Sequence, residues 1–322
     1  MTPAVEATGL TKRFGSLTAV NEVDLRVDEG EVYGILGPNG AGKTTFLRML
    51  FGLIRPDAGQ LRVFGNSWAQ EGPRALDGVA GFVESPRFYP YLSGGQNLAL
   101  LAGLDAGDAT SRIGDVLDVV ELADRAMDKV AGYSFGMRQR LGVAASLLRE
   151  PKLLVLDEPA NGLDPAGIRD MRALVKRLAA SGLTVLLSSH NMGEVEEICD
   201  NVTIMRTGRV AYHGSITQLR ALAPDPAHRL HTSDDPQALA IAGSHPALTI
   251  SDHGERGLTV RAPQAEVDAY VISLGAAKIA VRSLELDLAP LESLFFMLTE
   301  TGPGDGDTVT GAGAQTLIGA SR

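Results

Sequence analysis

A glycine-rich segment, residues 37–45, has the composition of a phosphate-binding loop. It reads GPNGAGKTT, matches the pattern G-x-x-x-x-G-K-[ST], and lies between an apolar run over 32–36 and a helical pattern over 45–53. Glycines let backbone N–H groups crowd around a polyphosphate, and the N-terminus of the following helix adds a favourable dipole. An idle glycine turn is the alternative, but the strand and helix on either side favour phosphate binding.

Within this loop, two side chains have distinct chemical roles. The Lys43 ammonium should lie on the β- and γ-phosphates of a nucleotide, and the Thr44 hydroxyl should bind Mg²⁺. The residues expected to contact the nucleotide are Gly37, Pro38, Asn39, Gly40, Ala41, Gly42, Lys43, Thr44 and Thr45.

Two carboxylates follow a second apolar run, residues 153–156. Asp157 is suited to the Mg²⁺ shell, and Glu158 is suited to polarise an attacking water as a general base. An acidic pair after a strand often only begins a helix. The phosphate-binding loop in the same chain favours the catalytic interpretation.

The elements that must position these groups are those of an α/β fold. Residues 1–222 alternate β-type runs with helical patterns, which is typical of a mostly parallel sheet flanked by helices. The runs 32–36, 153–156 and 184–188 are continuously apolar, as expected where helices cover both faces. Ligands gather at the carboxyl ends of such strands. Between about 93 and 150 only helical patterns occur (97–104, 113–122 and 135–149), which indicates a helical insert.

The second half of the chain changes character. Residues 223–236 are rich in Pro and Asp, which predicts a linker. Residues 237–300 read as a small α+β module, with strands at 258–261 and 280–284 and helices near 264–274 and 291–299. We expect this module to support packing or dimerisation rather than bind a ligand, because no group of residues in it has ligand or catalytic spacing. The tail, residues 301–322, is expected to be disordered.

Composition excludes several classes of protein. Lys and Arg number 29 against 39 Asp and Glu, so the net charge is −10 and nucleic acid is not an expected partner. The single cysteine, Cys199, forms no internal disulfide, fits a reducing compartment, and reads as a small apolar filler. The first residues lack a secretory signal pattern, and no apolar run reaches the ~18 residues of a membrane-spanning helix. Any membrane work therefore needs a partner.

Taken together, GPNGAGKTT and LLVLDEPANGLDP make the first 220 residues resemble the nucleotide-binding subunit of ABC transporters. The resemblance implies a P-loop NTPase domain of the ABC type that uses ATP and Mg²⁺. It also implies a head-to-tail dimer that sandwiches two ATP molecules, with the loop 161–164 meeting the other copy. A separate transmembrane permease is the implied partner, and the implied location is cytoplasmic, at the inner face of the plasma membrane.

The family's signature segment, close to LSGGQ, should lie just before the helix that precedes the acidic strand. Those letters occur at 92–96, but Ser93 is 64 residues before Asp157, too far for one helix and a turn. The segment YSFGMRQRL places Ser134 only 23 residues before Asp157. We therefore assign the γ-phosphate contact across the dimer to Ser134 and Gly136. Ser93 followed by Gln96 is interpreted as a helix capping box.

Three more positions carry roles through the resemblance. Phe14 resembles the aromatic residue that stacks on adenine, with a core phenylalanine as the alternative. His190, after the run 184–188, resembles the switch histidine that bonds the γ-phosphate and orients the water. Glu84 stands where most members carry Gln, after the strand 79–83, and is expected to act as a charged Mg²⁺ ligand.

The branch of the family is indicated by Glu84 with its neighbours and by the end of the chain. ESPRFYP and APLESLFFMLTE resemble segments of bacterial ATPases that export drugs and peptide antibiotics. The aromatic segment 86–92 corresponds to the groove that accepts a helix from the membrane subunit. We therefore expect the ATPase of a bacterial exporter. The alternative is a soluble ABC-type ATPase of translation or DNA repair, which the acidic charge and the lack of a long coiled-coil insert disfavour.

Overall fold

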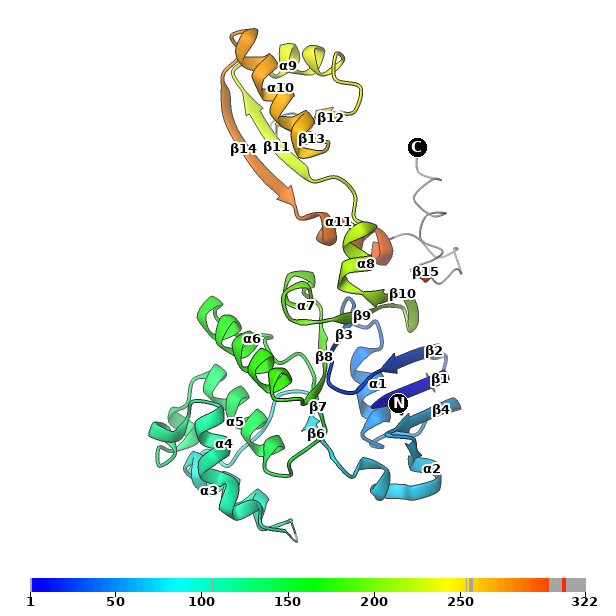
Figure 1. Ribbon diagram of the computed structural model, residues 1–322, viewed down its shortest axis with the longest axis vertical. Coiled ribbons are helices and arrows are strands. Elements are labelled where there is room, and N and C mark those ends of the chain that lie inside the picture. The colour runs from blue at the N-terminus through cyan, green and yellow to red at the C-terminus, as the bar shows by residue number, and fades with distance from the viewer. Residues whose placement is uncertain (1, 106, 253, 255–256, 301–308, 311–322) are drawn as a thin grey trace. The chain divides into compact units, whose positions relative to one another are not determined.

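The computed structural model describes residues 2–105, 107–252, 254, 257–300 and 309–310, and it contains two compact units. The first unit is Met1–Ile216, joined by strand β15 (Val309–Thr310), and the second is Thr217–Thr301 (Figure 1). The other strands of the first unit are β1 (Val5–Phe14), β2 (Leu17–Val27), β3 (Val32–Leu36), β4 (Ala58–Val63), β5 (Asn66–Ser67), β6 (Val79–Phe82), β7 (Leu153–Leu156), β8 (Thr184–Ser189), β9 (Asn201–Arg206) and β10 (Arg209–Ser215). Its α-helices are α1 (Lys43–Leu50), α2 (Trp68–Glu71), α3 (Gly94–Ala102), α4 (Ile113–Val119), α5 (Phe135–Leu147), α6 (Pro165–Ala180) and α7 (Met192–Ile198).

A seven-stranded sheet forms the centre of the first unit, in the order β15-β10-β9-β3-β8-β7-β6. The five strands from β9 to β6 run parallel to one another. Every residue of β3, β7 and β8 is buried, because helices and a second sheet cover both faces. The predicted parallel sheet flanked by helices is thus confirmed.

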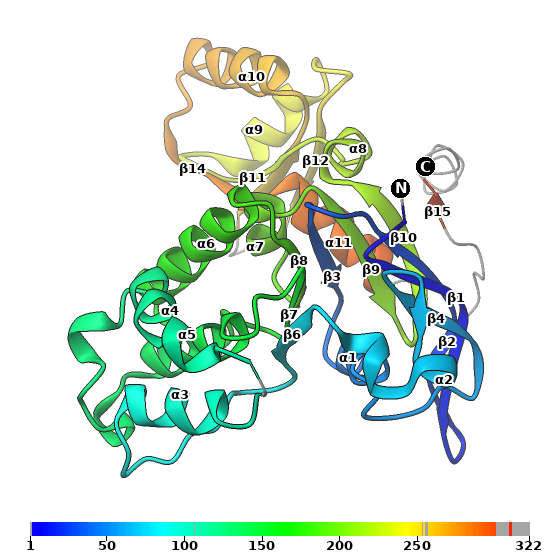
Figure 2. The ribbon, with the colours of Figure 1, turned by 60° about the horizontal axis from the view of Figure 1, so that its bottom comes forward.

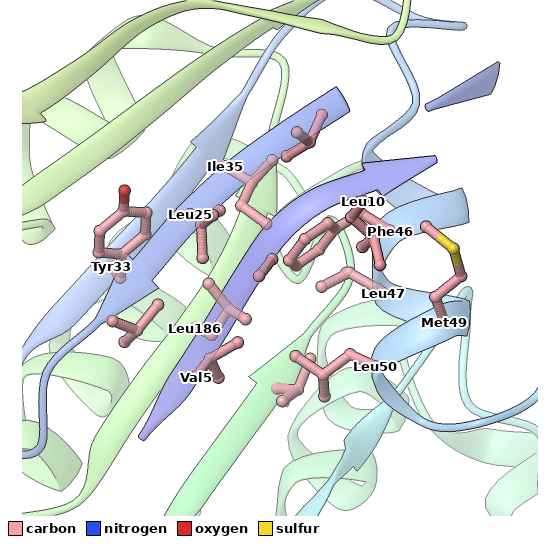
Figure 3. Close-up of a cluster of buried hydrophobic side chains, with 14 of the residues drawn as sticks. Val5, Leu10, Leu25, Tyr33, Ile35, Phe46, Leu47, Met49, Leu50 and Leu186 are labelled. Carbon is pink, nitrogen blue, oxygen red and sulfur yellow. The ribbon is translucent and has the colours of Figure 1, made fainter. Parts of the chain in front are cut away.

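The second sheet of this unit is antiparallel, in the order β2-β1-β4-β5, and was not predicted from the sequence. Its inner residues pack with helix α1 and with β3 in one apolar core (Figure 3). Leu10, Ile35, Phe46 and Leu47 are all fully buried there. Burial of each such side chain stabilises the fold by about 1.5–3 kcal/mol. This core holds the start of α1, and therefore Lys43, in a fixed place.

Cys199 follows α7 and is buried against β3. A Cβ added to Gly34 would lie 3.0 Å from its sulfur atom. Burial raises the pKa of the Cys199 thiol far above its usual range, so the thiol stays protonated at neutral pH. The expected role as an apolar filler agrees with this position.

Helices fill the stretch of chain between β6 and β7. Besides α3, α4 and α5 it contains the short 3₁₀ helices η2 (Ala109–Arg112), η3 (Ala123–Arg125) and η4 (Val130–Gly132). A further 3₁₀ helix, η1 (Gly72–Leu76), precedes β6. Ser93 begins α3 with a complete capping box: its side chain accepts from the Gln96 N–H, and the Gln96 side chain accepts from the Ser93 N–H. The interpretation of the letters LSGGQ as a helix start is confirmed.

The second unit is a four-stranded antiparallel sheet in the order β12-β13-β11-β14, with helices on one face. Leu230, Leu258 and Val260 of the sheet pack against Tyr270 and Leu274. Its elements are α8 (Ile216–Ala221), which spans the boundary, β11 (Ala227–Thr232), α9 (Asp235–Ala242), β12 (Thr249–Asp252), β13 (Leu258–Arg261), α10 (Gln264–Ala276), β14 (Val281–Leu288) and α11 (Pro290–Glu300).

The prediction that residues 223–236 form a linker is wrong, because this segment contains strand β11 of the sheet. Ala227 and Leu230 are buried, and β11 pairs with β13 on one side and β14 on the other. The Pro and Asp residues that indicated a linker flank the strand. One of them, Asp234, caps helix α9 by accepting from the Gln237 N–H. The expected disordered tail, 301–322, lies outside the described residues except for Val309–Thr310.

Gly81 offers a test of how tightly the parallel strands are packed. Its φ is 151°, and a Cβ at this position would lie 1.9 Å from the carbonyl oxygen of Val155 in β7. Gly81→Ala should therefore lower the free energy of unfolding by about 2 kcal/mol or more. Gly132→Ala is the control, because an added Cβ there meets nothing within 4 Å. Equal urea midpoints for the two variants would contradict the packing described here.

Candidate active site

The predicted site residues follow four adjacent strands of the central sheet. Strand β3 leads into the glycine-rich loop, β6 is followed by Glu84, β7 by Asp157 and Glu158, and β8 by His190. The sheet order β3-β8-β7-β6 places these four carboxyl ends along one edge (Figure 2). Parallel strands gather ligand-binding groups at this edge.

The glycine-rich loop has a conformation that side chains would obstruct. Gly42 has φ 106°, and a Cβ there would lie 2.4 Å from the carbonyl oxygen of Ala19. The loop is pinned at its start, where the Gly37 N–H donates to the Ser189 carbonyl at 3.2 Å. Helix α1 begins at Lys43, so Lys43, Thr44 and Thr45 form its first turn. An anion placed over this turn would meet free backbone N–H groups and the positive end of the helix dipole.

Lys43 is a buried cation, only 5% exposed, and it is fully paired. Its ammonium donates to the Gly37 carbonyl at 2.6 Å and lies 3.1 Å from Glu158 Oε1. The second oxygen of Glu158 lies 2.5 Å from His190 Nδ1. Lys43, Glu158 and His190, the three residues expected to be catalytic, therefore form one connected group.

The expected metal ligands Thr44 and Asp157 also meet. The Thr44 hydroxyl donates to Asp157 Oδ2 at 3.1 Å. Mg²⁺ prefers oxygen ligands, and in nucleotide sites it takes one or two from the protein and the rest from phosphates and water. The donor set fits that requirement. No cluster of three or more His, Cys, Asp and Glu side chains suited to a metal occurs within the described part of the chain.

Glu84 is divided between two neighbours. Its backbone N–H points to Asp157 Oδ2 at 3.3 Å, whereas its carboxylate forms an ion pair with Arg48 of α1. The side chain of Glu84 is 62% exposed. The structure thus brings the backbone of Glu84 to the site, and its expected role as a metal ligand stays a prediction.

Ser188 belongs to this site and was missed by the sequence analysis. Its hydroxyl donates to Asp157 Oδ1 at 2.5 Å and accepts from the Glu158 N–H at 2.9 Å. It therefore orients both carboxylate residues. The sequence did carry a signal, because Ser188 is a polar residue in a fully buried strand and lies two positions before the expected site residue His190.

The residues assigned to the partner's nucleotide and to adenine lie apart from this group. Ser134 caps helix α5 by accepting from the Met137 N–H, and Gly136 lies in the first turn. Phe14 ends β1, is 48% exposed, and carries the Lys12 ammonium 5.4 Å above its ring. The alternative that Phe14 is a core residue is therefore wrong. Among the contacts of the described residues, none joins Ser134, Gly136 or Phe14 to Lys43.

Comparison with known proteins agrees with this geometry. Residues 20–161 match the family model described as ABC transporter. Over 300 residues the chain is 34% identical to the uncharacterized ABC transporter ATP-binding protein YhcH of Bacillus subtilis (strain 168), and the match covers 93% of this chain and 97% of that protein. The chain belongs to the family of ABC transporter ATP-binding proteins. The resemblance stated from the two sequence motifs is confirmed.

The ABC subunit is also similar to a named transport protein and to a solved structure. It is 41% identical over 211 residues to the bacitracin transport ATP-binding protein BcrA of Bacillus licheniformis, which covers 65% of this chain and 69% of that protein. A solved structure of an ATP binding subunit of an ABC transporter superposes with a TM-score of 0.60 at 30% identity, and covers 68% of this chain and 92% of that one. The predicted P-loop fold of the ABC type is thereby confirmed. Members of the family hydrolyse ATP to power transport.

Removal of the Ser188 hydroxyl tests its place in the ABC site. Ser188→Ala takes one donor from Asp157 and the acceptor from the Glu158 N–H, so the Mg²⁺ concentration for half-maximal ATPase activity should rise about tenfold or more. Ser146→Ala is the control, because this buried hydroxyl donates to the Gly142 carbonyl within its own helix, α5. An unchanged Mg²⁺ concentration for half-maximal activity in the Ser188→Ala variant would refute the role of Ser188.

Proposed function

We propose that this chain binds and hydrolyses ATP to power a bacterial exporter of drugs or peptide antibiotics. The observation that carries the proposal is the connected group of Lys43, Glu158 and His190 beside the Thr44–Asp157 pair. Lys43 pairs with the Glu158 carboxylate in this structure, and a polyphosphate bound to the loop would replace that carboxylate as its anionic partner. Lys43 then stabilises the charge that develops on the transferred phosphoryl group.

Glu158 is the proposed general base. Once phosphate oxygens have taken over Lys43, the Glu158 carboxylate is left bonded to His190 and free to accept a proton from the attacking water. His190 orients that carboxylate and reaches toward the γ-phosphate. Thr44 and Asp157 would hold Mg²⁺, which supplies charge neutralisation on the β- and γ-phosphates.

A second copy of the chain completes the proposed site. Ser134 is exposed at the start of α5, a helix of 13 residues, so its N-terminus can face a phosphate bound elsewhere. We propose that Ser134 and Gly136 of one copy contact the γ-phosphate held by the other, and that the loop 161–164 lies at the same interface. Phe14, exposed at the end of β1, is the proposed platform for adenine.

The membrane partner is proposed to bind a groove on the first unit. A cavity of about 510 Å³ is lined by Phe82, Pro86, Phe88 and Leu104 among others, and Leu104 is 85% exposed. Exposed apolar side chains of this kind mark an interface. Tyr89 and Tyr91, 54% and 64% exposed, continue the apolar surface, which supports a separate transmembrane permease as occupant. None of the helices that the structure describes could span a bilayer.

The relative named for bacitracin transport supports export over the alternative in translation or DNA repair. Attachment to a permease would place the chain at the cytoplasmic face of the plasma membrane, the proposed location. We also propose residues 1–222 as the nucleotide-binding domain. The part of the second unit from β11 onward is then a separate module that supports packing or dimerisation.

The general base is tested by Glu158→Gln, which keeps the size of the side chain and removes its basicity. ATP binding should persist, whereas turnover should fall by a factor of roughly 10² to 10⁴. With ATP bound and hydrolysis blocked, the variant should elute from gel filtration as a dimer. Glu71→Gln, at an exposed position of α2, serves as the control. Full hydrolysis by the Glu158 variant would overturn the assignment.

The groove is tested by co-purification from detergent-solubilised membranes. Leu104→Asp places a charge on the apolar lining and should abolish recovery of the membrane subunit with a tagged copy of the chain. Met127→Asp is a matched control, because Met127 is 84% exposed and lies outside the groove lining. Equal recovery with both variants would exclude this groove as the binding surface.

A further inference from the structure

An ion pair connects the end of helix α1 with the segment after β6. Arg48, in the last turn of α1, contacts the carboxylate of Glu84. The two side chains are 41% and 62% exposed. Ion pairs this open to water are weak, because solvent screens the attraction and both side chains lose conformational freedom. The Glu84 carboxylate can therefore leave Arg48 for a stronger partner at a small cost in free energy.

The backbone of Glu84 is held at the metal ligands while its side chain points elsewhere. Its N–H lies 3.3 Å from Asp157 Oδ2, and its φ is 68°, in the left-handed region. Asp157 is in turn fixed by Thr44 and Ser188. Since the Cα of Glu84 is anchored beside Asp157, side-chain rotation alone decides which cation the carboxylate meets.

We propose that Arg48 is a positioning residue that holds the Glu84 carboxylate away from the Mg²⁺ site. Arg48 and the metal then compete for one carboxylate. This inference rests on the proposed function, because it takes Thr44 and Asp157 as the residues that hold Mg²⁺. The ammonium of Lys43 cannot replace Arg48 in this role, since it is buried and already paired with Glu158.

Competition has a direction that can be measured. A divalent ion held by Asp157 and phosphate oxygens attracts a carboxylate more strongly than an exposed guanidinium does. A metal ion held at this site would therefore draw the Glu84 carboxylate away from Arg48. The energy spent on breaking the pair is subtracted from metal binding, so Arg48 lowers the apparent affinity of the nucleotide complex for Mg²⁺.

A double-mutant cycle tests the competition. The readout is the Mg²⁺ concentration that half-saturates binding of a fluorescent, non-hydrolysable ATP analogue to the full chain. Arg48→Met should lower this concentration about two- to five-fold when Glu84 is present. In the Glu84→Gln background the same substitution should have little effect. Arg48→Lys, which keeps the charge, should restore behaviour close to the original.

Controls separate the pair from the charge alone. Arg55→Met removes a positive charge from an exposed position soon after α1 and should leave the magnesium midpoint unchanged. Binding of the analogue in EDTA should be equal for all variants, which shows that the nucleotide pocket is intact. An effect of Arg48→Met that is equal in both Glu84 backgrounds, or absent from both, would overturn the inference.

Failure of the inference and failure of the proposed function give different results. If the original chain binds the analogue with Mg²⁺ and only the coupling between Arg48 and Glu84 is missing, the ATPase proposal stands and the positioning role falls. If the original chain binds no analogue at any magnesium concentration, the proposed function itself falls.

Discussion

The carboxylate of Glu158 is shared between a buried ammonium and an imidazole, and the rest of the first unit is arranged around that sharing. Lys43 can be buried only because Glu158 and the loop carbonyls neutralise and bond it. Glu158 can bond His190 because β7 and β8 are neighbours in the sheet, so their ends lie side by side. Sheet order is thus a condition for the chemistry as well as for the core.

The proposed phosphate chemistry follows from exchange of partners. Each functional group already has a partner that phosphate or metal can displace: Glu158 for Lys43, Thr44 for Asp157, and Arg48 for Glu84. A site built this way buries no uncompensated charge before its ligand arrives. All three pairs join helix α1 to the segments that follow β6 and β7, so binding of the ligand acts on α1 and on both of these segments.

Much of this site was predictable because its residues are local in sequence. The loop 37–45 is recognisable from the spacing of its glycines and Lys43. Asp157 and Glu158 are recognisable because they follow an apolar run. The capping box at Ser93 was predictable for the same reason, since its two partners are three residues apart. The parallel sheet followed from continuous apolar runs, which only strands covered on both faces require.

What the sequence could not reveal depends on contacts between distant segments. The Arg48–Glu84 pair joins residues 36 positions apart, and Ser188 reaches Asp157 across 31 positions. Strand β11 was taken for a linker because Pro and Asp flank it, whereas its pairing depends on β13 and β14 further along the chain. The antiparallel sheet of the first unit was missed because β1 pairs with β4, which lies more than forty residues later in the chain.

The burial of Cys199 has a practical consequence for watching this molecule work. The chain carries a single thiol, which packs against β3 and stays protonated at neutral pH. A cysteine introduced on the surface, for example at the tip of a strand or near the groove, would therefore take up a spin label or fluorophore alone. Distances across a pair of subunits become measurable in the otherwise native polypeptide.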